Sequence, residues 1–291
     1  MNHWFFDVGR WTPVWAIMFL LGQTMYQSCT YSNINEERTE LVAGTPKGAS
    51  TEAKGEVYLL IVGISEYQAI DNLQYCDDDA RLFHNLFNGS ISPSNIVLLQ
   101  NRKATKKNIL SAMKKLFSRA NENDKVIFYF SGHGANGVFC NYDIQPAMAK
   151  THLTHQEIKE VFRACKASTK LLIADACRAG SLRSNTHSKT IDLGEAKDGY
   201  NNFEDQEHNV IVFASSRASE ASEELPELQN GIFTYYLVKG LKGAADFDRN
   251  KYITIGEWFL YTKQKIVAIN PNQHPVLFGK FSKNLSLVKL K

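Results

Sequence analysis

The sequence predicts one α/β domain whose mostly parallel β-sheet is covered by helices on both faces, after an N-terminal signal or anchor segment. Two observations lead to this fold class. First, five short runs of Val, Ile, Leu, Phe and Tyr follow Glu56, as expected for strands buried on both faces. Second, segments with helical periodicity separate these runs, and such alternation produces right-handed crossovers and a parallel sheet.

The individual elements follow from the same patterns. The expected strands cover 57–63, 95–100, 125–132, 170–176 and 209–216. The expected helices cover 77–88, 105–120 and 154–165, with two more near 230–242 and 254–267. Thr154 with Glu157, and Thr254 with Glu257, fit the capping box, in which a hydroxyl and a carboxylate satisfy the free amides of a first helical turn.

Composition excludes several classes of protein. The chain has 291 residues, 44% of them hydrophobic and 22% charged, which is ordinary globular usage and excludes wholesale disorder and collagen-like repeats. A net charge of +3 gives no reason to expect nucleic acid as a partner. Five cysteines without CxxC pairs argue against a disulfide framework and against a structural zinc site.

The N-terminus carries an apolar segment. Residues 11–22 are uncharged and follow Arg10, and at about a dozen residues they are short for a spanning helix, which needs roughly 20, but suit a secretory signal. The segment runs to Ser28-Cys29 and resembles a bacterial lipoprotein signal, in which Cys29 would be lipidated. The alternatives are an uncleaved membrane anchor or a buried N-terminal helix. We expect export and tethering to a membrane through a polar linker, residues 30–55.

Two of the expected strands end in unusual chemistry. One runs into Ser131-Gly132-His133-Gly134, and another into Asp175-Ala176-Cys177. In parallel sheets the functional crevice lies at the carboxyl ends of the strands. If the two strands are neighbours, the His133 imidazole can assist proton transfer while the Cys177 thiolate attacks a carbonyl. The amides of Gly134 and Cys177 are candidates for an oxyanion hole. Taken singly, such residues are more often structural.

These motifs carry a resemblance. FYFSGHG, followed 44 residues after its histidine by the cysteine of DACRAG, resembles the caspase-type cysteine peptidases, and most of all the metacaspase and bacterial caspase-like branch. The resemblance covers about residues 56–280 and implies a caspase-like fold. Carried over residue by residue, it makes His133 the catalytic histidine and Cys177 the nucleophile.

The resemblance also predicts a specificity. Caspases cleave after Asp by means of arginines, whereas metacaspases cleave after Arg or Lys by means of carboxylates. Four positions match the residues that line the metacaspase pocket for the side chain before the scissile bond (P1): Cys76, Asp79, Ser131 and Asp175. Carboxylates in a narrow pocket attract a cation and repel acidic side chains, so we expect cleavage after Arg or Lys. For the acidic run 77–79 the alternative is a helix N-terminus, where carboxylates meet the dipole favourably.

A second acidic segment has the spacing of a calcium-binding EF-hand loop. Asp246, Asp248, Asn250 and Glu257 stand at positions 1, 3, 5 and 12 of that loop, but Lys251 occupies the sixth position, which normally requires Gly. The alternative is a turn that caps the following helix. The chemistry itself needs no cofactor. Because metacaspases are often calcium-activated, the resemblance implies calcium as an activator, at this loop or elsewhere.

The predicted organisation is therefore a signal or anchor (1–29), a linker (30–55) and one peptidase domain (56–291). The domain divides into a large segment (56–180), a linker (181–208) and a small segment (209–291). The second linker lacks apolar periodicity, and segments of this kind are functional or disordered. It offers three basic residues as self-cleavage sites, namely Arg183, Lys189 and Lys197. The alternative is a loop that is never processed.

The leading hypothesis is a cysteine endopeptidase tethered in a bacterial envelope, acting on protein or peptide substrates with a basic P1 residue. The first alternative is a catalytically quiet caspase-like binding or signalling module. A cysteine transferase or non-peptide hydrolase has no motif in its favour. The sequence leaves the oligomeric state open. It assigns roles to three of the five cysteines, Cys29, Cys76 and Cys177, and none to Cys140 and Cys165.

Overall fold

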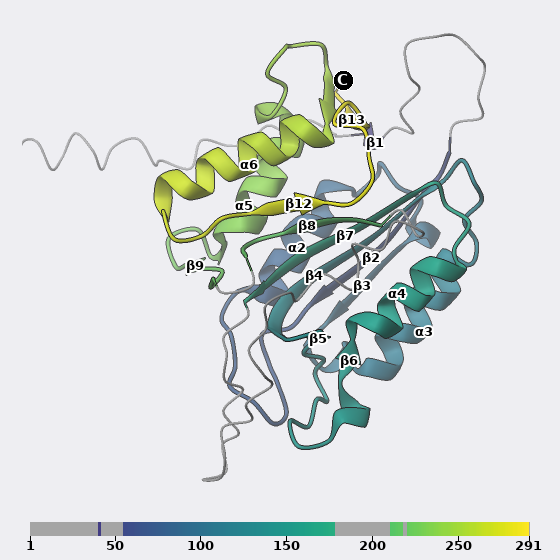
Figure 1. Cartoon of the computed structure of the whole chain (residues 1–291), viewed down its shortest axis with the longest axis vertical. Coiled ribbons are helices and arrows are strands. Elements are labelled where there is room, and N and C mark those ends of the chain that lie inside the picture. The colour runs from purple at the N-terminus through teal and green to yellow at the C-terminus, as the bar shows by residue number, and fades with distance from the viewer. Residues whose placement is uncertain (1–39, 42–54, 178–209, 218–219, 291) are drawn as a thin grey trace, which may run out of the picture. The chain divides into compact units, whose positions relative to one another are not determined.

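The central element of the fold is a mostly parallel sheet. The structure, a computed structural model, describes residues 40–41, 55–177, 210–217 and 220–290, and only the backbone of residues 40, 41 and 177. The strand order is β12-β8-β7-β4-β2-β3 (Figure 1). Five of these strands are parallel: β2 (Val57–Gly63), β3 (Ile96–Gln100), β4 (Lys125–Ala135), β7 (Thr169–Cys177) and β8 (Val210–Ala214). The sequence-based prediction of a mostly parallel sheet is confirmed.

The edge strand β12 (Val276–Phe278) departs from that prediction, because it pairs antiparallel with β8. Its three residues are all apolar, but a run of three is too short to mark a strand in the sequence.

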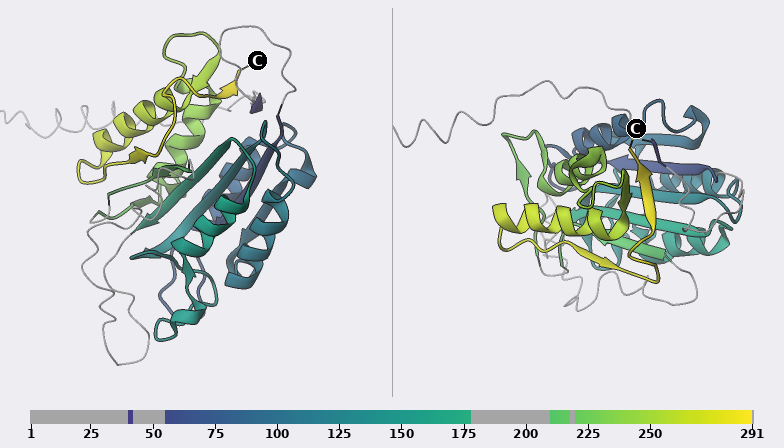
Figure 2. Two further views of the ribbon diagram at one scale, coloured as in Figure 1. Left: turned by 45° about the vertical axis from the view of Figure 1, so that its right-hand side comes forward. Right: turned by 90° about the horizontal axis from the view of Figure 1, so that it is seen from above.

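Helices cover both faces of the sheet (Figure 2). On one face, α3 (Lys106–Phe117) and α4 (His155–Ala164) pack with alternate strand residues such as Leu60 and Phe128. On the other face, α2 (Cys76–Leu86), α5 (Ile232–Lys239) and α6 (Ile255–Ile269) pack with the intervening residues such as Ile61 and Tyr129. Successive strand residues therefore point into two separate hydrophobic cores, one on each face of the sheet. This explains why the strands are apolar at nearly every position.

The two expected capping boxes start two of these helices. Thr154 precedes α4, and its hydroxyl accepts from the Glu157 amide at 3.2 Å while the Glu157 carboxylate accepts from the Thr154 amide at 3.0 Å. Thr254 and Glu257 form the same pair of bonds at the start of α6. Local sequence thus fixes where both helices begin.

Short elements complete the described residues. Two small hairpins consist of β5 (Val138–Phe139) with β6 (Leu153–Thr154), and of β9 (Glu224–Leu225) with β10 (Asn230–Gly231). A third small sheet joins β13 (Ser286–Lys289) to β11 (Tyr252–Thr254) and to β1 (Glu40–Leu41). Single helical turns lie at Pro93–Asn95, Asn101–Lys103 and Ala149–Thr151, and a π-turn at Gly240–Ala244 extends α5.

The apolar segment at 11–22 lies outside the described residues. Among the helices that are described, none combines the length and the apolarity that crossing a membrane requires.

Candidate active site

The two motif residues lie on neighbouring strands. In the parallel pair β4·β7, His133 stands opposite Cys177, and Ser131 stands opposite Asp175. Both pairs lie at the carboxyl ends of their strands. Adjacent strands of a sheet are about 4.8 Å apart, so the backbones of His133 and Cys177 are immediate neighbours.

The His133 ring is held by the loop that follows β2. Its Nε2 lies 2.9 Å from the backbone oxygen of Asp71. A carbonyl oxygen can only accept, so Nε2 carries the hydrogen and the other ring nitrogen, Nδ1, is left as the base in the neutral imidazole. Burial lowers the pKa of His133, while the hydrogen bond and the charge of Asp71 act in the opposite direction. The ring is therefore oriented and is biased towards its neutral form.

The other four predicted residues come together beside this pair. Cys76 opens α2, Asp79 lies one turn further along it, and Ser131 and Asp175 lie on β4 and β7. All four are buried, with exposed fractions of 5%, 1%, 1% and 6% in chain order. The Ser131 hydroxyl donates to Asp79 Oδ2 at 3.0 Å. We call these four residues the acidic pocket, after the role that the resemblance implies for them.

A close helix–strand contact brings α2 to this place. A Cβ on Gly63, the last residue of β2, would lie 2.3 Å from the Cys76 oxygen and 2.4 Å from the Ala80 Cβ. Only a residue without a side chain lets the start of α2 rest on the strand end in this way. This contact places Asp79 over the ends of the strands.

The two carboxylates of the acidic pocket have raised pKa values. Burial is the main cause for both, and the negative charge of Asp175 adds to the rise at Asp79. Among the described residues, no Lys or Arg forms an ion pair with either carboxylate. Burial therefore disfavours the charged form of both carboxylates, and no described cation of this chain offsets that cost.

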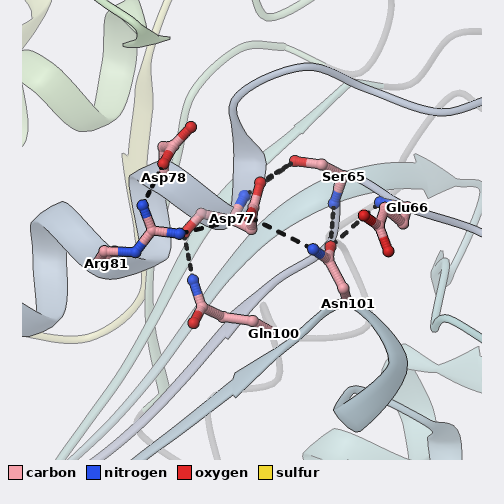
Figure 3. Close-up of polar contacts among 7 residues, drawn as sticks. All are labelled: Ser65, Glu66, Asp77, Asp78, Arg81, Gln100 and Asn101. Carbon is pink, nitrogen blue, oxygen red and sulfur yellow. Dashed lines mark hydrogen bonds and ion pairs between the residues drawn. The ribbon is translucent and has the colours of Figure 1, made fainter.

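The neighbouring acidic residues have a different role. Asp77 accepts from the Ser65 hydroxyl and from the Asn101 amide, and Asp78 pairs with Arg81 on the surface (Figure 3). Asp77 thus ties the first turn of α2 to the segments that follow β2 and β3, whereas the Asp78 pair lies within α2. The helix-terminus interpretation of the run 77–79 therefore holds for Asp77 and Asp78, whereas Asp79 faces the pocket.

The caspase domain family model matches residues 57–286, most of the chain. The chain belongs to this family. Metacaspase-1 of Meyerozyma guilliermondii is 32% identical to it over 92 residues, and Metacaspase-1 of Debaryomyces hansenii 34% over 92 residues. Each match covers 29% of this chain but only 22% and 21% of those proteins, so the chain spans about a fifth of their length. The resemblance seen in the motifs is thus confirmed at the level of the family.

One solved structure supports the fold. A protein of Geobacter sulfurreducens superposes on this caspase domain with a TM-score of 0.58 and 16% sequence identity. The superposition covers 79% of this chain and 97% of that one. At this identity the likeness shows the fold alone.

Sequence reasoning missed the residues that close the acidic pocket of this caspase domain. The Asn230 amide and the Gly231 N–H donate to Asp79 Oδ1 at 3.0 and 2.9 Å. The hydroxyls of Ser222 and Thr234 donate to Asp175 at 2.6 and 2.8 Å. All four lie on or beside the β9–β10 hairpin, and no local pattern in the sequence marks them.

The same hairpin reaches the start of α2. The Glu224 carboxylate accepts from the amides of Gln74 and Tyr75 at 3.1 and 2.8 Å, and lies 3.4 Å from the Cys76 sulfur. A Cβ on Gly231 would lie 2.9 Å from one oxygen of each pocket carboxylate, Asp79 and Asp175. Only a residue without a side chain at position 231 therefore lets the β10 backbone pack directly against both carboxylates.

The calcium-like loop adopts a compact turn. Asp246, Asp248 and Glu257 each offer an oxygen, and these oxygens lie within 4.8 Å of one another. Lys251 takes the left-handed conformation (φ 66°) for which a Gly was expected, and its amide donates to Asp246. The alternative is also visible, because Glu257 caps α6. Calcium binding here stays a prediction.

Several predictions concern parts of the chain outside the described residues. They are lipidation of Cys29, the signal at 1–29, the linker at 181–208 and self-cleavage at Arg183, Lys189 or Lys197. The side chain of Cys177 is also outside them.

Proposed function

We propose that this caspase domain is a cysteine endopeptidase that cleaves after Arg or Lys. The observation that carries the specificity is the pair of buried carboxylates, Asp79 and Asp175, with no described cation of this chain paired to them. A guanidinium or ammonium group of a substrate would supply that cation, and an acidic side chain would add to the repulsion between the two carboxylates.

The proposed chemistry starts with Nδ1 of His133, the ring nitrogen opposite the Asp71 contact. Nδ1 takes the thiol proton of Cys177, and the thiolate sulfur forms a bond to the scissile carbonyl carbon. The C–N bond then breaks, the leaving amine receives the proton from His133, and a thioester remains. Water attacks this thioester with His133 as the base, which releases the carboxylate product and restores the thiol.

Backbone amides would stabilise the oxyanion. The N–H and C=O of His133 are occupied, by the Tyr67 hydroxyl and by the Cys140 amide. Because successive peptide groups along a strand point to opposite sides, the next amide, of Gly134, points towards β7. Together with the Cys177 amide it would bind the developing negative charge.

A panel of fluorogenic peptides with Arg, Lys or Asp at P1 tests the proposal with the full chain. We expect cleavage of the Arg and Lys peptides and none of the Asp peptide. Cleavage after Asp alone would overturn the pocket assignment. Cleavage of no peptide, together with no labelling of Cys177 by a thiol probe, would favour the binding or signalling module instead.

The same panel tests calcium. We propose calcium as an activator on the strength of the oxygen cluster of Asp246, Asp248 and Glu257. Cleavage should rise with added calcium and fall with a chelator. Asp248→Asn, which removes one carboxylate from the cluster, should raise the calcium concentration that is needed. Equal rates with calcium and with chelator would contradict the proposal.

A further inference from the structure

One buried tyrosine contacts the backbone of His133. The hydroxyl of Tyr67 accepts from the His133 N–H at 2.8 Å, and the two ring centroids are 5.1 Å apart at an angle of 45°. Tyr67 is 9% exposed. Burial raises its pKa well above the ordinary value, so the hydroxyl stays protonated.

The tyrosine hydroxyl provides a hydrogen-bond acceptor beyond the point where β2 ends. Strand β2 pairs with β4 as far as Gly63, opposite Ser131, and the Ile64 N–H still donates to the Ser131 oxygen at 3.0 Å. The next peptide group of β4 on that side belongs to His133, because peptide groups alternate along a strand. There the chain after β2 has already turned away, and the Tyr67 hydroxyl provides the acceptor.

The loop that carries Tyr67 also holds the imidazole. Asp71, four residues further on, supplies the carbonyl that accepts from His133 Nε2. Tyr67 itself is fixed by its own N–H, which donates to the Asn72 side chain at 2.8 Å. One short loop therefore holds His133 by its backbone and by its ring.

This loop is anchored to the neighbouring strand end. Asn101 follows β3 in a left-handed conformation (φ 46°), and its Oδ1 accepts from the amides of Ser65 and Glu66 at 2.9 and 3.1 Å. Figure 3 shows that the Asn101 side chain also donates, through its Nδ2, to Asp77 at the start of α2. The loop that carries Tyr67 is thus bonded to the residue that follows β3.

We propose that Tyr67 is a positioning residue, which sets the distance and angle of His133 relative to Cys177 through its hydrogen bond to the His133 backbone. The proposal deepens the proposed peptidase function, and its kinetic test rests on that function. Removing the hydroxyl leaves a buried N–H without this acceptor, and the strand end then shifts to satisfy it. Displacement of a reacting group by about 1 Å can cost about 100-fold in rate.

The test compares Tyr67→Phe with Tyr58→Phe in the full chain. Tyr58 is a matched control, because it lies in the same core at the other end of β2, and its hydroxyl donates to the Arg119 oxygen at 3.4 Å, away from His133. Each variant is assayed on an Arg-P1 peptide, and its active sites are counted with an irreversible peptidyl inhibitor. For Tyr67→Phe, kcat per counted site should fall by about 10- to 100-fold, with KM nearly unchanged. Tyr58→Phe should keep the wild-type kcat.

Counting sites separates positioning from folding. If Tyr67→Phe lost activity only through fewer active sites, with normal kcat at each, its role would be structural and the inference would be wrong. An unchanged kcat would overturn it as well, and would leave the peptidase proposal intact.

A second readout serves if the wild type cleaves no peptide, in which case the peptidase proposal fails. The pH titration of the His133 imidazole by NMR then decides. A midpoint that moves in Tyr67→Phe but not in Tyr58→Phe supports positioning, and equal midpoints in all three proteins overturn it.

Discussion

Replacing Cys177 by Ala is expected to abolish peptide cleavage, with a loss of kcat/KM on the order of 10⁴-fold or more. The reason is chemical: alanine has no atom that can bond to the scissile carbonyl, and His133 alone leaves only weak assistance to water. The measurement is the rate of cleavage of an Arg-P1 peptide by the purified full chain, with thermal unfolding recorded alongside.

The matched control is Cys165→Ala. Cys165 is buried and lies at the end of α4, with its sulfur 3.3 Å from the Phe117 oxygen. This variant should lose some stability, because a small cavity forms, and should keep its activity per folded molecule. If Cys177→Ala kept much more activity than a 10⁴-fold loss of kcat/KM allows, another nucleophile would carry out the chemistry.

Asp175→Asn should have the second largest effect. Breaking a buried charge pair by removing one partner costs about 3–5 kcal/mol, which corresponds to a loss of kcat/KM for Arg and Lys peptides of about 100-fold or more. The fold should persist, since two of the groups that donate to Asp175 are the hydroxyls of Ser222 and Thr234, and a hydroxyl can turn to accept from the new amide.

The same variant should be at least as stable as the wild type at neutral pH. The pKa of Asp175 is raised in the folded protein, so the stability that protonated Asp175 contributes is fully present below its unfolded pKa and is lost as pH rises through the folded pKa. Asparagine is neutral at every pH, so the Asp175→Asn variant keeps this contribution to stability as the pH rises. The stability difference between Asp175→Asn and the wild type should therefore shrink as the pH is lowered.

Activity and stability should then move in opposite directions at one position, which ordinary damage to the fold does not produce. Asp78→Asn is the control, because Asp78 is a surface carboxylate paired with Arg81. It should leave cleavage unchanged. If Asp175→Asn cleaved Arg peptides as fast as the wild type, the acidic pocket would not be the P1 site.

The sequence predicted the parallel strands and helix starts well, because both are encoded locally. Runs of apolar residues mark strands buried on two faces, and Thr154 and Thr254 carry their capping partners three residues away. The strand β12 was not predicted, since a run of three apolar residues is too short to stand out as a strand.

The candidate site was predictable where a motif carries it. Family resemblance singled out His133, Cys177 and the acidic pocket, but could not indicate what surrounds them. Asn230 reaches Asp79 across 151 positions of the chain, and Glu224 reaches Cys76 across 148. Tyr67 stands in an irregular loop, and its role follows from where β2 ends relative to β4. Such contacts arise from tertiary packing, and nothing local in the sequence encodes them.

The most direct test of the account is covalent labelling followed by peptide mapping. The full chain is treated with two peptidyl acyloxymethyl ketones that differ only in P1, one carrying Arg and the other Asp, and the modified residue is located by mass spectrometry. The account predicts one added label, on Cys177, with the Arg probe and none with the Asp probe. Labelling of Cys177 by the Asp probe alone, or labelling of another cysteine in place of Cys177, would contradict it.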